Sequence, residues 1–155
     1  MKRNLIITAL FFVLSTITTP LWAFDHNHPL FDQVLQKHTS GGIVDYASLQ
    51  KNPKNLNLYL KKLENVNSKD FKTWTINNQL AFWINTYNAY TLKLILENYP
   101  IDSIRHIQRS PWKKKIISIF ESLHSLNDIE HNILRRQYDE PRIHFALVCA
   151  SRSCP

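Results

Sequence analysis

The residues with the most reactive side chains gather near the C-terminus, where both cysteines occur within "PRIHFALVCASRSCP", residues 141–155. A cysteine thiolate is a nucleophile and a metal ligand, and two neighbouring cysteines can form a disulfide. Cys149 and Cys154 are close enough along the chain to bridge through a tight reversal of the backbone. The alternatives are therefore a catalytic thiol, a disulfide between these two residues, or a metal site.

A metal site has the weakest support of the three. The sequence contains neither a CxxC nor an HExxH pattern. Glu130 and His131 are adjacent, so on a helix their side chains point about 100° apart and do not share a face. We therefore predict no metal and no cofactor.

A catalytic thiol needs a base, and side-chain direction decides between two histidines. The segment "RIHFALVCA" is rich in β-branched and aromatic residues, which predicts a strand. Side chains alternate along a strand, so Arg142 and His144 point to the face opposite Cys149. His131, on the preceding helix, is the better base. In this hypothesis Cys149 attacks an acyl group, backbone amides of the small residues after it hold the oxyanion, and Glu130 or an asparagine orients the imidazole.

An acidic residue interrupts the apolar face of the helix predicted from Ser125 to about Tyr138. Glu130 falls inside that face rather than opposite it. A carboxylate there needs a cation or several donors, which Arg105, Arg135, Arg142 or nearby asparagine amides can supply. Two interpretations stay open, a structural ion pair and an acid–base pair with the neighbouring histidine.

Two amides raise the same question on the long helix predicted from about Ile76 to Asn98, before Pro100. Its expected hydrophilic stripe consists of Gln79, Thr86, Lys93 and Glu97. Asn85 and Asn88 lie outside that stripe, and a buried amide without a partner costs about 1–3 kcal/mol. We expect them either to tie a neighbouring loop's backbone to the helix or to orient a catalytic side chain or ligand.

The other elements follow from caps, breakers and periodicity. Further helices are predicted over residues 29–38, about 53–64, a short stretch from Ser68 and a turn in "IDSIRHI", with a loop and a short extended piece in "SGGIVDY". Ser125 and Asp128 form a capping-box-like helix start. "KIISIFESLHSL" predicts two short strands around a turn. The expected fold is a mostly helical α+β single domain whose small sheet combines this hairpin with the C-terminal strand.

Residues 1–23 have the layout of a secretory signal peptide. A basic start at Lys2 and Arg3 precedes an apolar stretch from Leu5 to about Thr19, then Pro20 and a small residue, Ala23. The apolar stretch is shorter than the roughly 20 residues that span a bilayer. We predict cleavage near Ala23, a single domain over residues 24–155, and a periplasmic or secreted protein. The alternative is an inner-membrane protein anchored by the uncleaved segment.

The net charge of the chain limits the classes of partner that it is expected to bind. The formal net charge of +7 falls by two when Lys2 and Arg3 are removed with the leader. An exported basic protein meets anionic envelope components rather than nucleic acid, so we expect at most weak contact with such components and no nucleic-acid partner. The basic run Lys113 to Lys115 is interpreted as a solvated turn. Other partners and the oligomeric state are not indicated by the sequence.

Three blocks of the sequence resemble a known family. "NQLAFWINTYNAYTLKLILENYP", "SLNDIEHNILR" and "PRIHFALVCASRSCP", in this order and spacing, are similar to the domain of unknown function 547, over about residues 45–155. That family occurs in secreted and periplasmic bacterial proteins and in plant proteins. The resemblance therefore implies a family for this chain but no particular reaction. The family's hallmark positions fall on Asn85, Asn88, Glu130, His131, Arg142, His144, Cys149, Ser153, Cys154 and Pro155.

Two departures from the family pattern bear on folding and function. The turn between the short strands usually contains glycine and here reads Phe120-Glu121-Ser122, which predicts a looser hairpin. Family members continue past the cysteine-proline motif, so we expect a truncated member with an incomplete active site and an unpaired strand edge.

Two functions from different classes remain. One is an exported protein whose polar cluster only holds the fold. The alternative is a thiol-dependent hydrolase or acyltransferase of the envelope, with Cys149 as nucleophile and His131 as base.

Overall fold

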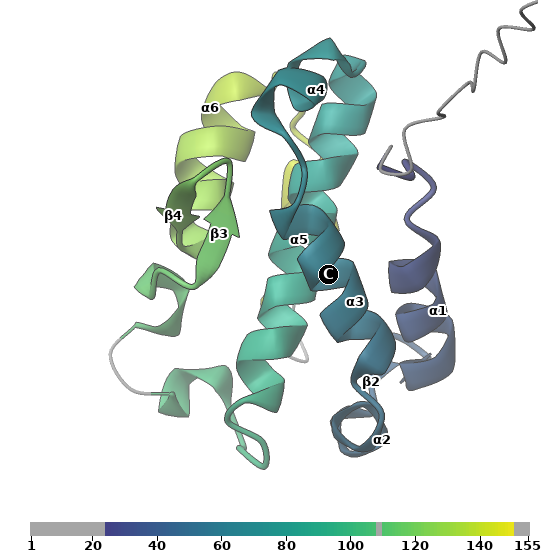
Figure 1. Cartoon of the computed structure of the whole chain (residues 1–155). Helices are drawn as coiled ribbons and strands as arrows, with labels where there is room; N and C mark the ends of the chain where they lie inside the picture. Colours follow the sequence, from purple (N-terminus) through teal and green to yellow (C-terminus); the bar gives the residue numbers. More distant parts are fainter. Residues whose placement is uncertain (1–23, 108–109, 151–155) are drawn as a thin grey trace, which may run out of the picture.

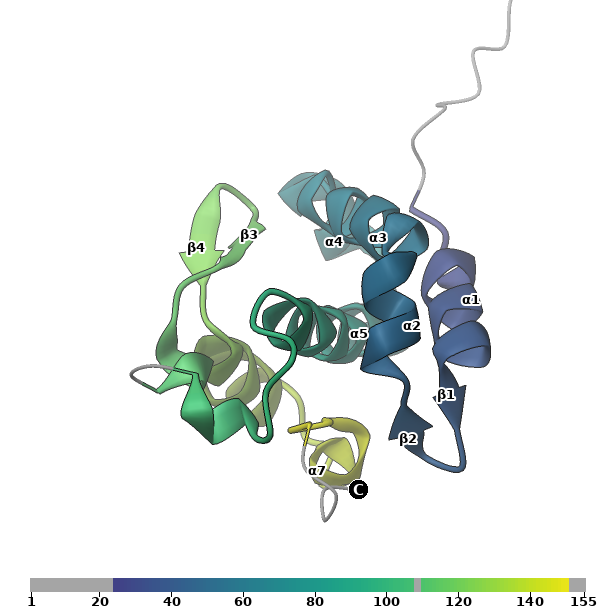
Figure 2. The same cartoon turned by 90° about the horizontal axis from the view of Figure 1, so that it is seen from below.

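One long helix, α5 (Ile76–Leu96), runs through the middle of the computed structural model, which describes residues 24–107 and 110–150. Figure 1 shows α1 (Pro29–His38) and α3 (Lys54–Glu64) on one side of it and the hairpin of β3 (Ile117–Ile119) and β4 (Ser122–His124) on the other. The remaining elements are β1 (Thr39–Ser40), β2 (Ile43–Val44), α2 (Tyr46–Lys51), α4 (Ser68–Thr73), the 3-10 turns η1 (Ile104–His106) and η2 (Pro111–Lys113), the π-helix η3 (Asp128–Leu134), α6 (Arg135–Gln137) and α7 (Ile143–Ala146). Seen from below in Figure 2, these elements surround α5. The predicted class, a mostly helical α+β single domain, is confirmed.

Helix boundaries follow local signals in the sequence. Pro29 opens α1 as predicted. The hydroxyl of Thr75, which was not predicted as a cap, accepts the amide of Asn78 at 3.2 Å at the start of α5. The capping box is present, since the amide of Asp128 donates to the hydroxyl of Ser125 at 3.1 Å and the amide of Ser125 donates to a carboxylate oxygen of Asp128 at 2.9 Å. The helix that follows is first a π-helix and then α6, rather than one uniform α-helix. Helix α2 was not predicted: the loop and short extended piece expected in "SGGIVDY" end at Tyr46, where α2 begins, and the residues of α2 after Tyr46 were given no assignment.

Helix α5 is buried on nearly every side, which corrects its predicted hydrophilic stripe. Thr86 is fully buried rather than exposed to solvent, and its hydroxyl donates a hydrogen bond to the carbonyl of Phe82 at 2.7 Å. Thr91 donates in the same way to the carbonyl of Tyr87 at 2.9 Å. A threonine that bonds to its own helix can be buried at little cost, and this is why hydropathy misplaced it. Lys93 and Glu97 do lie toward solvent, joined at 3.0 Å.

The two hairpins use different turn residues. Gly41 and Gly42 both have positive φ between β1 and β2. Phe120 and Glu121, with φ of 52° and 61°, take the same left-handed region between β3 and β4, where side chains are disfavoured. The ring of Phe120 packs against that of Phe71 at 4.9 Å, so core packing helps to hold this turn without glycine.

The predicted C-terminal strand is wrong. Residues Ile143–Ala146 form the short helix α7, Leu147 is extended, and residues 147–149 belong to no helix or strand. Within the described residues, β3 and β4 pair only with each other, so no sheet edge receives this segment. The side chain of Asn88 takes that place: its amide donates to the carbonyl of Ala146 at 2.9 Å, and its oxygen accepts the amide of Val148 at 2.9 Å.

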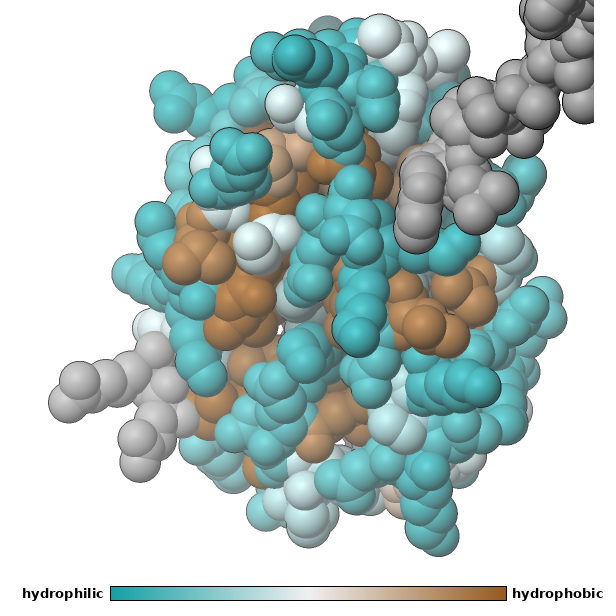
Figure 3. All heavy atoms as spheres, viewed as in Figure 1, coloured by the Kyte–Doolittle hydropathy of each residue, from teal (hydrophilic) through white to brown (hydrophobic). Residues whose placement is uncertain are grey.

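Hydrophilic side chains cover most of the face in Figure 3, with apolar patches between them. The exposed large apolar residues are scattered over several elements: Ile43, Leu58, Ile76, Leu123, Phe145 and Val148. Across residues 24–107 and 110–150, no helix has both the length and the hydropathy required of a membrane span. The proposed leader, residues 1–23, lies outside the described residues.

Candidate active site

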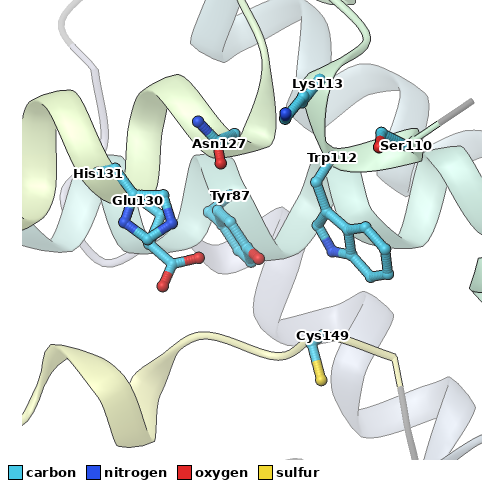
Figure 4. Close-up of a pocket in the computed structure, with 8 residues that line it drawn as sticks. All are labelled: Tyr87, Ser110, Trp112, Lys113, Asn127, Glu130, His131 and Cys149. Carbon is cyan, nitrogen blue, oxygen red and sulfur yellow. The ribbon is translucent and has the colours of Figure 1, made fainter.

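A pocket of about 300 Å³ opens where α5, η2, η3 and the segment after α7 meet. Its lining is Tyr87, Ser110, Trp112, Lys113, Asn127, Glu130, His131 and Cys149. Cys149, His131 and Glu130 therefore come together from two separate segments, as Figure 4 shows. The three residues nominated for thiol chemistry border one cavity.

The other five lining residues were missed as site residues. Tyr87 was assigned to the apolar face of α5, and Lys113 to a solvated turn. Nothing in the local pattern around Trp112 indicated a pocket, because its position depends on how the chain after α5 folds back. Asn127 carried a usable signal: it precedes His131 by four residues, the spacing that aligns side chains on a helix.

The cation expected beside Glu130 is present: it is Arg135, one of the three arginines predicted as partners. The guanidinium of Arg135 donates to Glu130 Oε1 at 3.1 and 2.8 Å. The two residues are five apart, and the i→i+5 pattern of the π-helix places such residues close together. The side chains of Glu130 and Arg135 are 21% and 41% exposed, so the pair stabilises the fold only modestly. Its main consequence is that the charge of Glu130 is already neutralised at the pocket wall.

The backbone that carries Cys149 is held by Asn88. The two amide bonds of Asn88 fix residues 146 and 148 on the outside of α5, immediately before the half-buried cysteine. Ala150 follows with φ of 58°, a left-handed conformation that costs an alanine about 1–2 kcal/mol. Strained backbone of this kind is found at functional sites, where neighbouring contacts hold it in place. In Figure 4 the thiol points away from His131 and Glu130.

The structure does not bring Asn85, Arg142 or His144 to the pocket lining. Asn85 is half-buried on α5 and makes no side-chain hydrogen bond with the described part of the chain. Arg142 is exposed, and its guanidinium donates hydrogen bonds to the two carboxylate oxygens of Glu140 at 2.8 and 2.5 Å. These bonds lower the pKa of that carboxyl to about 2. His144 is exposed, with its ring beside that of Phe145 at 5.6 Å. The expectation that His144 faces away from Cys149 relied on strand alternation, which does not apply to a helical turn.

Two further questions raised by the sequence concern the second cysteine and metal binding. Cys154, with Ser153 and Pro155, lies outside the described residues, so its disulfide with Cys149 stays a prediction. Among the residues that are described, no group of three His, Cys, Asp or Glu side chains is arranged to hold a metal ion.

Comparison with known proteins gives one result. A family model described as "Protein of unknown function, DUF547" matches residues 71–155, which is more than half of the chain and includes the whole lining of the pocket. Neither the curated proteins nor the solved structures contain a significant match. The resemblance inferred from the three sequence blocks is thus confirmed. The chain belongs to the DUF547 family.

Proposed function

We propose that the chain is an exported protein whose pocket carries out thiol-dependent acyl transfer or hydrolysis in the cell envelope. The observation that carries this proposal is that Cys149 and His131, which come from the segment after α7 and from η3, border the same cavity. A nucleophile and a base at one pocket are the minimum for covalent catalysis. The N-terminal pattern of residues 1–23 supports the export.

The proposed reaction begins with a change of rotamer. The Cys149 side chain turns from the direction seen in Figure 4 into the pocket, between staggered positions about its Cα–Cβ bond. His131 then takes the thiol proton, and the sulfur forms a bond to the substrate's acyl carbon while the carbonyl electron pair moves onto oxygen. When that pair returns, the bond to the leaving group breaks, and the imidazolium gives its proton to the leaving group. A thioester on Cys149 remains.

Water completes the cycle in hydrolysis. His131 removes a proton from the water, whose oxygen bonds to the thioester carbon. The carbon–sulfur bond then breaks, the acid leaves, and the thiolate takes the proton back from the imidazolium. An acceptor alcohol or amine in place of water gives acyl transfer by the same steps.

The Glu130 carboxylate has a positioning role in this scheme. Both bonds from Arg135 go to Oε1, so Oε2 makes no hydrogen bond within the described residues. That oxygen is available to accept an N–H from the imidazolium that forms during the reaction. Arg135 in turn holds the carboxylate in place through its two hydrogen bonds.

An activated ester tests the reaction. Incubating the reduced protein with 4-nitrophenyl acetate is expected to release a burst of nitrophenolate and to leave one acetyl group on Cys149, found by peptide mass spectrometry. Cys149→Ser is expected to abolish the burst, and His131→Gln to slow it by about 100-fold. A burst that survives in Cys149→Ser would exclude the thiol mechanism. Export is tested separately by cell fractionation and by the N-terminus of the recovered protein, which is predicted to begin after Ala23.

A further inference from the structure

The pocket contains one cation that no carboxylate neutralises. Lys113 lines the cavity and makes no ion pair within the described part of the chain. The acidic lining residue, Glu130, is paired with Arg135 through two hydrogen bonds. The balance of charge at the cavity therefore favours an anion.

The walls of the cavity limit the shape of the ligand that carries this anionic group. Figure 4 shows Lys113 and Asn127 on one side of the pocket and Cys149 on the opposite side, with the rings of Tyr87 and Trp112 between them. A ligand that reaches from Lys113 to Cys149 must cross these aromatic side chains. The volume of about 300 Å³ is at the lower end for small-molecule sites. The fitting ligand is small, with a flat or apolar middle.

We propose that the acyl substrate carries a carboxylate remote from the reacting carbonyl, bound by the ammonium of Lys113, with its apolar middle against Trp112 and Tyr87. This inference rests on the proposed function, because it describes the substrate of the reaction at Cys149. Asn127 also lines the pocket and supplies an amide donor to the carboxylate.

Two alkylating probes of matched size and reactivity test the charge preference. N-(4-carboxyphenyl)iodoacetamide and N-(4-carbamoylphenyl)iodoacetamide differ only in the anionic or neutral group far from the reacting carbon. In each case the Cys149 thiolate displaces iodide and forms a carbon–sulfur bond. Trypsin cleaves after Arg142 and Arg152, so Cys149 and Cys154 fall in separate peptides and are quantified independently.

The carboxylate probe is expected to label Cys149 of the reduced protein about twofold to fivefold faster than the neutral probe, the gain from one exposed ion pair. Lys113→Gln is expected to bring this ratio to about one, because it slows the carboxylate probe more than the neutral probe. Lys114→Gln, which removes the adjacent exposed lysine that does not line the pocket, is expected to keep the preference. Raising the salt to about 1 M is expected to weaken the preference in the wild type.

The possible results separate the two proposals. Equal rates for the two probes, with labelling that still depends on His131, would overturn the carboxylate assignment and leave the thiol mechanism standing. A preference that persists in Lys113→Gln would assign the anion to another residue and also overturn the inference. If neither probe labels Cys149, both proposals fail.

Discussion

Replacing Asn88 by alanine tests how the segment that carries Cys149 is held. The substitution removes two hydrogen bonds of 2.9 Å, one to the carbonyl of Ala146 and one from the amide of Val148. Each such bond contributes about 1 kcal/mol net. Ala146 is half-buried and Val148 exposed, so water replaces part of what is lost. We expect the free energy of unfolding to fall by about 1–2 kcal/mol.

Asn85→Ala is the matched control, because it removes the same side chain one turn earlier where no hydrogen bond to a described residue is made. Urea unfolding followed by the fluorescence of Trp74, Trp83 and Trp112 measures both variants. Asn88→Asp is expected to be at least as damaging as the alanine, because a carboxylate oxygen then faces the carbonyl of Ala146. Equal losses of stability in Asn88→Ala and Asn85→Ala would refute the assignment of Asn88 as the partner of this segment.

Two further predictions concern stability elsewhere. Burial is the main cause that lowers the pKa of His28, whose Nδ1 lies 2.7 Å from the hydroxyl of Tyr59. The folded state therefore binds fewer protons than the unfolded state. The contribution of this group to the free energy of unfolding is present above about pH 6.5 and is lost as the pH falls below it. Urea titrations at several pH values are expected to show a shallower loss in His28→Gln, and an unchanged slope would contradict this account. Glu121 has φ of 61°, so Glu121→Gly is expected to raise the free energy of unfolding by about 0.5–1 kcal/mol, the left-handed strain relieved less the entropy of glycine. Ser122→Gly, in β4, is the control and is expected to destabilise, and a loss of stability in Glu121→Gly would disprove the strain.

The helices could be predicted because their signals are local. Pro29 and the capping box of Ser125 and Asp128 are short-range signals, and each acts where it was predicted to act. The π-helix in η3 could not be read in the same way, since its i→i+5 pairing alters which side chains meet. Even so, one of the predicted arginines, Arg135, is the partner of Glu130.

The C-terminal segment failed as a prediction because its conformation depends on a distant side chain. Local β-propensity favoured a strand over residues 142–150, but a strand needs a partner edge and the segment meets Asn88 instead. The pocket shows the same limit. Cys149 and His131 could be nominated from their types, whereas Trp112 and Lys113 enter the lining through the path of the chain between α5 and β3.

The rate at which iodoacetamide labels Cys149 as the pH is varied tests the central claim most directly. If His131 withdraws the thiol proton, the reduced wild type is expected to react at pH 7 at least about tenfold faster than His131→Gln. The two rates are expected to converge near pH 10, where cysteine ionises without help. Indistinguishable profiles for the two proteins would contradict the assignment of this pocket as a thiol active site.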